Sequence, residues 1–368
     1  MSIVFGSPAD REPLRRLTGR VEQVAGAELY TRDDGSERGV RVVRVRTGEI
    51  DVEVVVDRAL DLAGASVRGM PVGWISPTGV AAPWFADPHG WGPFRTFFGG
   101  LLTTCGLEHT LGPTDDSATH FNYPGQHTHS FPLHGRLSVT PALLRGYGID
   151  WDAPEPAVFV RGEVRQANVF GEVLTLEREI RAPLGKRVLT LRDTVRNEGY
   201  APTPHMILYH VNAGWPLVGP NAKVTGLLGE PRFASPPAQG VDWRVVDEPT
   251  RGVAEQVWEH APLPAADGWG RAAILNPDIG DGRALGLEIA FGLDTLPRMF
   301  QWRVMNEGHY VIGLEPGNLR IQGRHAARDA GELVILEPGE TRSYRLDLTL
   351  HCEPAAVLAA STRLRRGT

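Results

Sequence analysis

Short runs in which apolar and polar residues alternate recur along the chain, and this period-two pattern predicts β-strands. In residues 39–69, valines alternate with charged residues. This stretch predicts three strands, with turns near Thr47–Gly48 and near Ala63–Gly64. Residues 171–199 repeat the pattern and predict two strands around a turn at Pro183–Gly185.

Further strands are predicted over residues 206–212, 310–316, 333–340 and 343–352, with Glu337–Glu340 as the turn between the last two. Helical periodicity is confined to residues 10–26 and 355–366. Residues 76–135 are rich in loops, and long ordered loops in β proteins commonly carry function. Repeats, low-complexity tracts and linkers are absent from the sequence. The pattern therefore predicts one all-β domain over residues 1–368, with residues 1–30 as an N-terminal extension.

The composition narrows the classes of partner. The 368 residues carry a formal net charge of -6, which argues against a nucleic acid held on a basic surface. No apolar run approaches the roughly 20 residues that a membrane-spanning helix needs. The first residues lack the apolar core of a signal peptide. With only two cysteines, Cys105 and Cys352, we expect a cytoplasmic protein without a disulfide framework.

Histidines gather in the loop-rich region, and they have two interpretations. His127, His129 and His134 could bind a metal, because alternate residues of a strand share a face. Alternatively, these histidines act singly as hydrogen-bonding or acid–base groups. Two more, His109 and His120, lie in the same region, but no nearby carboxylate completes an obvious ligand set.

Polar residues interrupt three apolar strands, where burial would be costly without a partner. His210 and Asn212 are two residues apart and share a face of the strand that begins at Met206. Glu315 ends an apolar run, and burial there would raise its pKa and make it a stronger base near neutral pH. Arg58 could hold a sugar hydroxyl or a carboxylate, or form a structural ion pair with an aspartate.

Taken together, the ordered phrases resemble the aldose 1-epimerase (galactose mutarotase) superfamily, and most closely its DUF4432 branch. These phrases are Asp57-RALDL, Phe98-GGLLTTCGL, Pro132-LHGR, Leu208-YHVNAGWPL, Phe300-QWRVMNEGHYVIGLEPGN and Leu336-EPGE.

The resemblance implies a β-supersandwich of antiparallel sheets with a concave sugar-binding face. It also implies a catalytic pair, with Glu315 as the base and a histidine as the acid, and it makes His134 a sugar ligand. His210 is the preferred acid, although the family usually has its asparagine four residues after the histidine. His205 is an alternative acid that a regular strand would turn to the other face. The family's substrate-binding aspartate has no clear match, and His260 lies in roughly that region.

The implied reaction interconverts sugar anomers and needs one acid, one base and no cofactor or metal. Arg58, His134, Asn212 and Gln301 are the expected hydroxyl ligands, with Phe300 or Trp302 stacking on the sugar. The expected partner is therefore a small sugar, with no nucleic acid and no membrane. The oligomeric state stays open, with a homodimer as one arrangement. Two alternatives remain: a non-catalytic sugar-binding protein, and a metal-dependent sugar isomerase that uses His127, His129 and His134.

Overall fold

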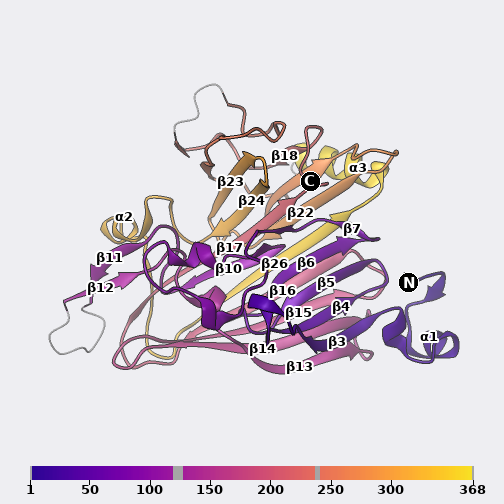
Figure 1. Ribbon diagram of the computed structural model, residues 1–368, viewed down its shortest axis with the longest axis horizontal. Helices are drawn as coiled ribbons and strands as arrows, with labels where there is room; N and C mark the ends of the chain where they lie inside the picture. Colours follow the sequence, from indigo (N-terminus) through magenta and orange to yellow (C-terminus); the bar gives the residue numbers. More distant parts are fainter. Residues whose placement is uncertain (1, 119–126, 237–240, 367–368) are drawn as a thin grey trace.

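Two large antiparallel β-sheets form the body of the protein (Figure 1). The computed structural model describes residues 2–118, 127–236 and 241–366. The twelve-stranded sheet runs in the order β19 (Phe233–Ser235), β20 (Gln256–His260), β23 (Arg298–Asn306), β24 (His309–Gly317), β17 (Thr203–Gly214), β10 (Leu102–Leu107), β6 (Asp61–Val67), β5 (Ile50–Val55), β4 (Arg41–Arg46) and β3 (Gly26–Thr31), with β25 (Val334–Leu336) beside β17 and β7 (Met70–Pro71) beside β6.

The second sheet has eight strands, in the order β13 (Leu143–Asp150), β14 (Ala157–Ala167), β15 (Val173–Pro183), β16 (Val188–Asn197), β26 (Thr341–His351), β22 (Leu285–Phe291), β21 (Gly270–Asn276) and β18 (Lys223–Gly226). Three two-stranded ribbons complete the strands: β1 (Ile3–Val4) with β2 (Ser7–Pro8), β8 (Trp74–Ile75) with β9 (Gly99–Gly100), and β11 (Thr114–Ser117) with β12 (Thr128–Phe131).

Helices lie at the margins of the sheets. They are α1 (Arg11–Leu17), α2 (Gly323–Asp329) and α3 (Pro354–Arg366), with single 3₁₀ turns η1 (Val21–Gln23), η2 (Gly35–Glu37), η3 (Pro83–Phe85), η4 (Gly92–Arg95) and η5 (Leu137–Val139). In Figure 1, α2 and the β11–β12 hairpin lie at one end of the molecule, and α1 lies at the opposite end. None of the helices in the described part of the chain is long and apolar enough to cross a membrane.

The main hydrophobic core lies between the two sheets. One continuous cluster joins Val54 and Ile207 of the twelve-stranded sheet to Leu191 and Leu346 of the other sheet. Burial of this apolar area is the main force that holds the sheets together. The core also contains an ion pair, because the Arg178 guanidinium donates to Asp193 and Asp61 with side chains at most 1% exposed.

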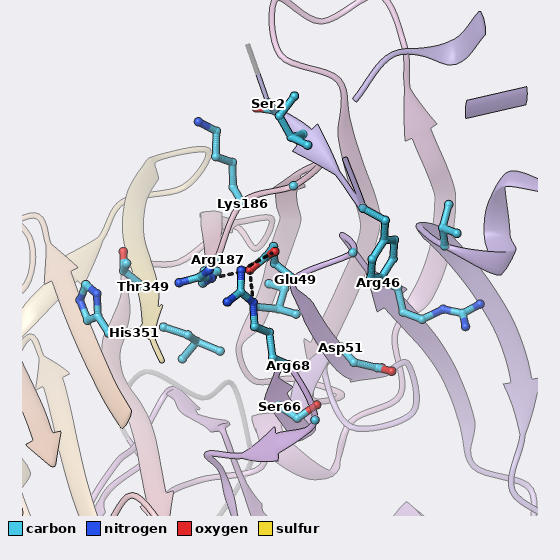
Figure 2. A pocket seen from close by; sticks show the side chains of 18 of the residues that line it. Ser2, Arg46, Glu49, Asp51, Ser66, Arg68, Lys186, Arg187, Thr349 and His351 are labelled. Carbon is cyan, nitrogen blue, oxygen red and sulfur yellow. Dashed lines mark hydrogen bonds and ion pairs between the residues drawn. The ribbon is translucent and has the colours of Figure 1, made fainter. Parts of the chain in front are cut away.

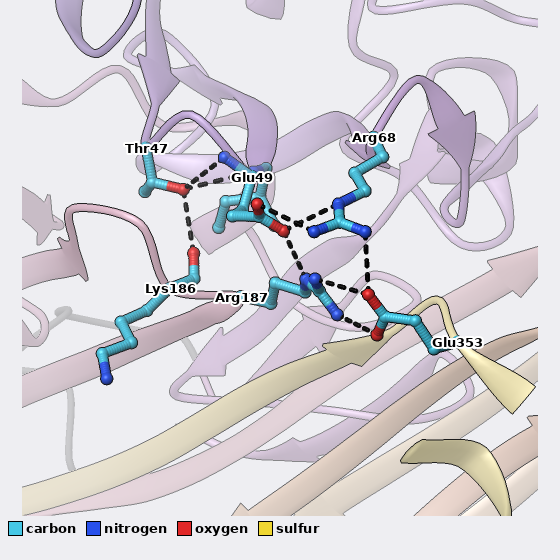
Figure 3. A network of polar contacts seen from close by, with 7 residues as sticks. Thr47, Glu49, Arg68, Lys186, Arg187 and Glu353 are labelled. Carbon is cyan, nitrogen blue, oxygen red and sulfur yellow. Dashed lines mark hydrogen bonds and ion pairs between the residues drawn. The ribbon is translucent and has the colours of Figure 1, made fainter. Parts of the chain in front are cut away.

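A second contact between the sheets is polar (Figure 3). Arg68 and Arg187 both donate to the Glu49 carboxylate, and both donate to Glu353. Glu49 and Arg68 flank strands of the twelve-stranded sheet, whereas Arg187 and Glu353 flank strands of the eight-stranded sheet. Two arginines and two carboxylates therefore join the ends of interior strands of both sheets.

The predicted strands are largely confirmed. The turns at Thr47–Gly48, Pro183–Gly185 and Glu337–Glu340 lie between strands, and both predicted helical regions contain a helix. The predicted turn near Ala63–Gly64 was wrong, because the chain turns over residues 56–60, where Ala59 and Leu60 have positive φ. Residues 63 and 64 lie inside β6.

Candidate active site

Strand β17 separates the core from the candidate site. All twelve of its residues are buried. The odd-numbered residues Ile207, Tyr209 and Val211 join the core between the sheets. Because successive side chains of a strand point to opposite faces, His210 and Asn212 lie on the face turned away from the eight-stranded sheet. The segment around β8 and β9 lies beside this strand, because Gly73 forms a β-bridge with Ala213 and the Asn212 amide donates to the Gly99 carbonyl.

His210 and Glu315 form a pair across two neighbouring strands. The register of β17 and β24 pairs Leu208 with Gly317 and Asn212 with Gly313, which sets His210 opposite Glu315. His210 Nε2 lies 3.2 Å from Glu315 Oε1, and the two side chains are 6% and 5% exposed. The two atoms are close, but their alignment does not make a hydrogen bond, and Glu315 Oε1 is left without a hydrogen-bond partner.

Burial changes the acid–base properties of both members. It lowers the pKa of His210 from its usual 6.5 to about 4. Burial raises the pKa of Glu315 well above its usual value, and the negative charge of Glu255 raises it further. Each effect favours the uncharged form of the group. Both shifts therefore favour a neutral ring beside a carboxylic acid over an imidazolium beside a carboxylate.

Three buried polar atoms at this place lack a hydrogen-bond partner: His210 Nδ1, Asn212 Oδ1 and Glu315 Oε1. The Asn212 amide is anchored, because its Nδ2 donates to the carbonyl oxygens of His210 (2.8 Å) and Gly99 (3.3 Å). A buried unpaired polar atom costs roughly 1–3 kcal/mol. Three such atoms on one face indicate a site built to bind polar groups.

Aromatic rings surround His210. The ring centroid of His210 lies 5.2 Å from that of Phe97, 5.3 Å from that of Trp302 and 5.7 Å from that of His134, all in edge-to-face geometry. Trp302 also meets the edge of Trp74, at 6.0 Å. The alternation of apolar and polar residues could not identify Phe97 as a site residue, because Phe97 lies in the irregular segment between β8 and β9.

His134 is held in one tautomer beside the pair. The backbone N–H of Leu111 donates to its Nδ1 at 3.3 Å, which places the ring proton on Nε2. Its backbone has a φ of 59°, a left-handed conformation that is uncommon for residues other than glycine. Burial and the nearby His210 and His109 keep the pKa of His134 well below its usual value. The neutral ring can therefore donate one hydrogen bond from Nε2.

Arg58 does not join this group, which corrects the prediction that it binds the sugar. Its guanidinium donates to the backbone carbonyls of Ser138, Ala81 and Thr96, and it lies over the ring of Phe98. It forms no ion pair with Asp57, which binds Arg41 instead. Arg58 thus ties together loops that cover the twelve-stranded sheet.

Gln301 lies on the opposite face of the sheet, which corrects a second prediction. The register pairs Phe300 with Glu315 and Gln301 with Leu314, a residue of the main core. Gln301 is fully buried, donates to the Trp243 carbonyl at 2.8 Å and lies 3.2 Å from His260 Nε2. His260 is therefore on that inner side as well, away from His210.

His205 also faces the core, as the spacing argument predicted. Its Nδ1 lies 2.9 Å from the Leu107 carbonyl oxygen, and its Nε2 lies 2.7 Å from the Tyr344 hydroxyl. Both ring nitrogens are occupied by protein groups. This leaves His210 as the histidine of β17 that meets Glu315.

The histidine cluster of the loop region does not form a metal centre in the described part of the chain. No group of three or more His, Cys, Asp or Glu side chains there could hold a metal ion. His127 is exposed, and His129 packs against Phe131. His120 lies outside the described residues.

The hollow shown in Figure 2 lies elsewhere, near the N-terminal residues. It has a volume of about 1190 Å³, and its lining includes Arg46, Glu49, Arg68 and Arg187. Its arginines are matched by carboxylates, as Figure 3 shows for Arg68 and Arg187. The candidate site is instead the group around His210 and Glu315, where an imidazole and a carboxyl group lie 3.2 Å apart.

Two packed antiparallel sheets of this topology define a galactose mutarotase-like β protein. A galactose mutarotase-like protein from Clostridium acetobutylicum has a TM-score of 0.62 at 12% identity, over 89% of this chain and 99% of that one. A Klebsiella pneumoniae protein, provisionally assigned as an aldose 1-epimerase, has a TM-score of 0.80 at 24% identity, over 92% of this chain and 87% of that one.

At these identities the likeness establishes the fold. The sequence itself matches the family model described as "Domain of unknown function (DUF4432)" over residues 37–350, so the chain belongs to the DUF4432 family. No curated relative matches the sequence.

Proposed function

We propose that the protein interconverts the anomers of an aldose or aldose derivative by acid–base ring opening and closure. The observation that carries the proposal is the buried His210–Glu315 pair, 3.2 Å apart, with unpaired polar atoms on both side chains. An acid and a base within reach of one reacting centre are what this reaction needs. The provisional assignment of the Klebsiella pneumoniae protein as an aldose 1-epimerase agrees with this proposal.

The reaction moves one proton through the pair. One member removes the proton from the anomeric hydroxyl, and the other protonates the ring oxygen as the C1–O5 bond breaks. The product is an open-chain aldehyde, and the proton has changed places between His210 and Glu315. Rotation about the C1–C2 bond exposes the other face of the aldehyde. Ring closure then reverses both transfers, so no proton is gained or lost.

The neighbouring groups support the same chemistry. The Nε2–H of His134 and the free Asn212 Oδ1 offer a donor and an acceptor to sugar hydroxyls. Phe97 and Trp302 supply ring faces beside His210 on which the apolar side of a sugar can stack. Arg58 and Gln301 have no part in this proposal, because their polar atoms bind backbone and core groups.

The direct test is Glu315→Gln, which removes one of the two proton-transfer groups and changes the side-chain volume little. Saturation-transfer NMR across a panel of aldoses, uronic acids and deoxy or sulfonated sugars would report both the substrate and its exchange rate. We expect Glu315→Gln to abolish exchange, and His210→Ala to slow it by about 10²-fold or more. Thermal unfolding of both variants checks that the fold is intact.

A Glu315→Gln variant that keeps full activity toward the true substrate would refute the mechanism. Saturable sugar binding by the wild-type protein without faster exchange would identify a sugar-binding protein instead.

A further inference from the structure

Glu255 connects the edge of the site to its aromatic ring. It lies just before β20, on the exposed surface, and its Oε2 accepts a hydrogen bond of 2.8 Å from Trp302 Nε1. The Trp302 ring in turn lies 5.3 Å from His210, at an interplanar angle of 74°. A hydrogen bond to an ionised acceptor is stronger than one to a neutral acceptor. Glu255 therefore fixes the ring that flanks the catalytic histidine.

The charge around the pair is negative. Among the described residues, no arginine or lysine forms an ion pair or a hydrogen bond with the side chain of His210, Glu315 or His134. Residues 119–126 and 237–240 contain neither amino acid. Glu255 is the charged group that acts on Glu315.

The arginines of the surrounding elements are engaged with other groups. Arg298 lies 3.7 Å from Glu259, and Arg303 donates to Gln256 and to the Val245 carbonyl. Arg324 donates to Asp116 on the β11–β12 hairpin. None of them offsets the charge of Glu255 at the site.

We propose that Glu255 is a positioning and specificity-determining residue: its carboxylate holds Trp302 against His210 and makes the site prefer aldoses with an ammonium group over aldoses with a carboxylate group. This inference rests on the proposed function, since it concerns which sugars the same pair accepts. A fixed charge beside a site raises the local concentration of ligands of opposite sign and disfavours ligands of like sign. Because Glu255 is exposed, solvent and salt weaken its effect.

The test uses three sugars that differ in charge: D-glucosamine below the pKa of its amino group, D-glucose and D-glucuronate. We expect the exchange efficiency to fall in that order, with a ratio of about 10 between the first and the last at low salt. Glu255→Gln keeps an acceptor for the Trp302 indole but loses the charge, so the ratio should shrink toward one. Glu307→Gln is the matched control and should leave the ratio unchanged. It removes an exposed carboxylate at the turn of the β23–β24 hairpin, where Glu307 pairs with Arg251.

Positioning is tested separately. Glu255→Ala removes the acceptor as well as the charge, so it should lower kcat toward D-glucose by more than Glu255→Gln does, since glutamine keeps a weaker acceptor for the Trp302 indole. The alkaline limb of the pH profile should move to lower pH in both variants, because loss of a negative charge lowers the pKa of Glu315. The titratable groups that face Glu315 are His210 on β17, Cys105 on β10 and Glu255, and only Glu255 is altered.

Two results would overturn the inference: an equal or greater rate for D-glucuronate than for D-glucosamine, or a ratio that Glu255→Gln leaves unchanged. If no sugar is exchanged at all, the proposed function fails instead. Ligand-observed NMR would then measure the binding of the same three sugars. The inference predicts that affinity falls from D-glucosamine to D-glucose to D-glucuronate, and that Glu255→Gln removes this preference.

Discussion

Gly313 offers a sharp test of the pair, because its missing side chain leaves room for the Glu315 carboxylate. A Cβ at this position would lie 2.4 Å from Glu315 Oε1, 3.2 Å from His210 Cε1 and 3.3 Å from Trp302 Cβ. An ordinary van der Waals contact begins near 3.4 Å, so the carboxylate oxygen would have to retreat by about 1 Å. A displacement of that size at a reacting group costs roughly 10²-fold in rate.

We therefore expect Gly313→Ala to slow anomer exchange by about 10²-fold, measured by saturation-transfer NMR on the sugar that the wild-type protein exchanges. The φ of Gly313 lies outside the left-handed region, so the backbone accepts alanine. The tight side-chain contacts should cost about 1–3 kcal/mol of stability, and thermal unfolding should show that the variant stays folded at the assay temperature. Gly317→Ala is the matched control on the same strand face, because its Cβ would meet its nearest atoms at 3.4–3.5 Å. Full activity in Gly313→Ala, or an equal loss in both variants, would refute this assignment of the pair.

Three further predictions concern groups around the site. Arg58→Met should lower the free energy of unfolding by about 3 kcal/mol or more, because three backbone carbonyls lose a charged donor. The KM for the sugar should stay unchanged. A raised KM at wild-type stability would instead support Arg58 as a sugar ligand. Burial lowers the pKa of His205 to about 4, below its unfolded value near 6.5, so this residue contributes stability that is present above pH 6.5 and lost as the pH falls toward 4. This contribution should reach about 3 kcal/mol, so urea unfolding across that window should show a loss in His205→Gln that is smaller than the wild-type loss by about that amount. A plot of the exchange rate against pH should show a plateau. Its acidic limit should lie near pH 4, where the His210 ring becomes protonated, and its alkaline limit should lie at the raised pKa of Glu315. A rate that rises steadily with pH would contradict this prediction.

The strands could be predicted because their alternation is local. The errors arose where burial on both faces hides the alternation. In β6, five of seven residues are buried, so the polar-looking Ala63–Gly64 region resembled a turn. The true turn at residues 56–60 contains Asp57 and Arg58, whose charges suggested a functional strand. Those charges are satisfied by Arg41 and by loop carbonyls far along the chain, which no local pattern can indicate.

The candidate pair was easier to predict than the sugar-binding residues around it, because odd and even positions of a strand point to opposite faces of the sheet. The same parity could have excluded Gln301. The β23–β24 hairpin turns at Glu307–Gly308, so counting back from this turn pairs residue 300 with Glu315 and residue 301 with Leu314. Gln301 therefore had to face the core whenever Glu315 did not. Phe97 offered no such count, since an irregular loop delivers it to His210.

The low exposure of the pair bears on why this arrangement suits the proposed reaction. Burial disfavours every charged state, so it favours a neutral His210 ring and a Glu315 carboxylic acid. The alternative placement of the same proton, as imidazolium and carboxylate, needs a polar partner beside each group, and a sugar hydroxyl and ring oxygen are such partners. Anomer exchange begins and ends with the same number of protons on the enzyme, so the two placements can alternate without solvent. A buried site with one shared proton therefore suits a reaction that only moves that proton. The unpaired Glu315 Oε1 is the atom at which the sugar would contact the pair.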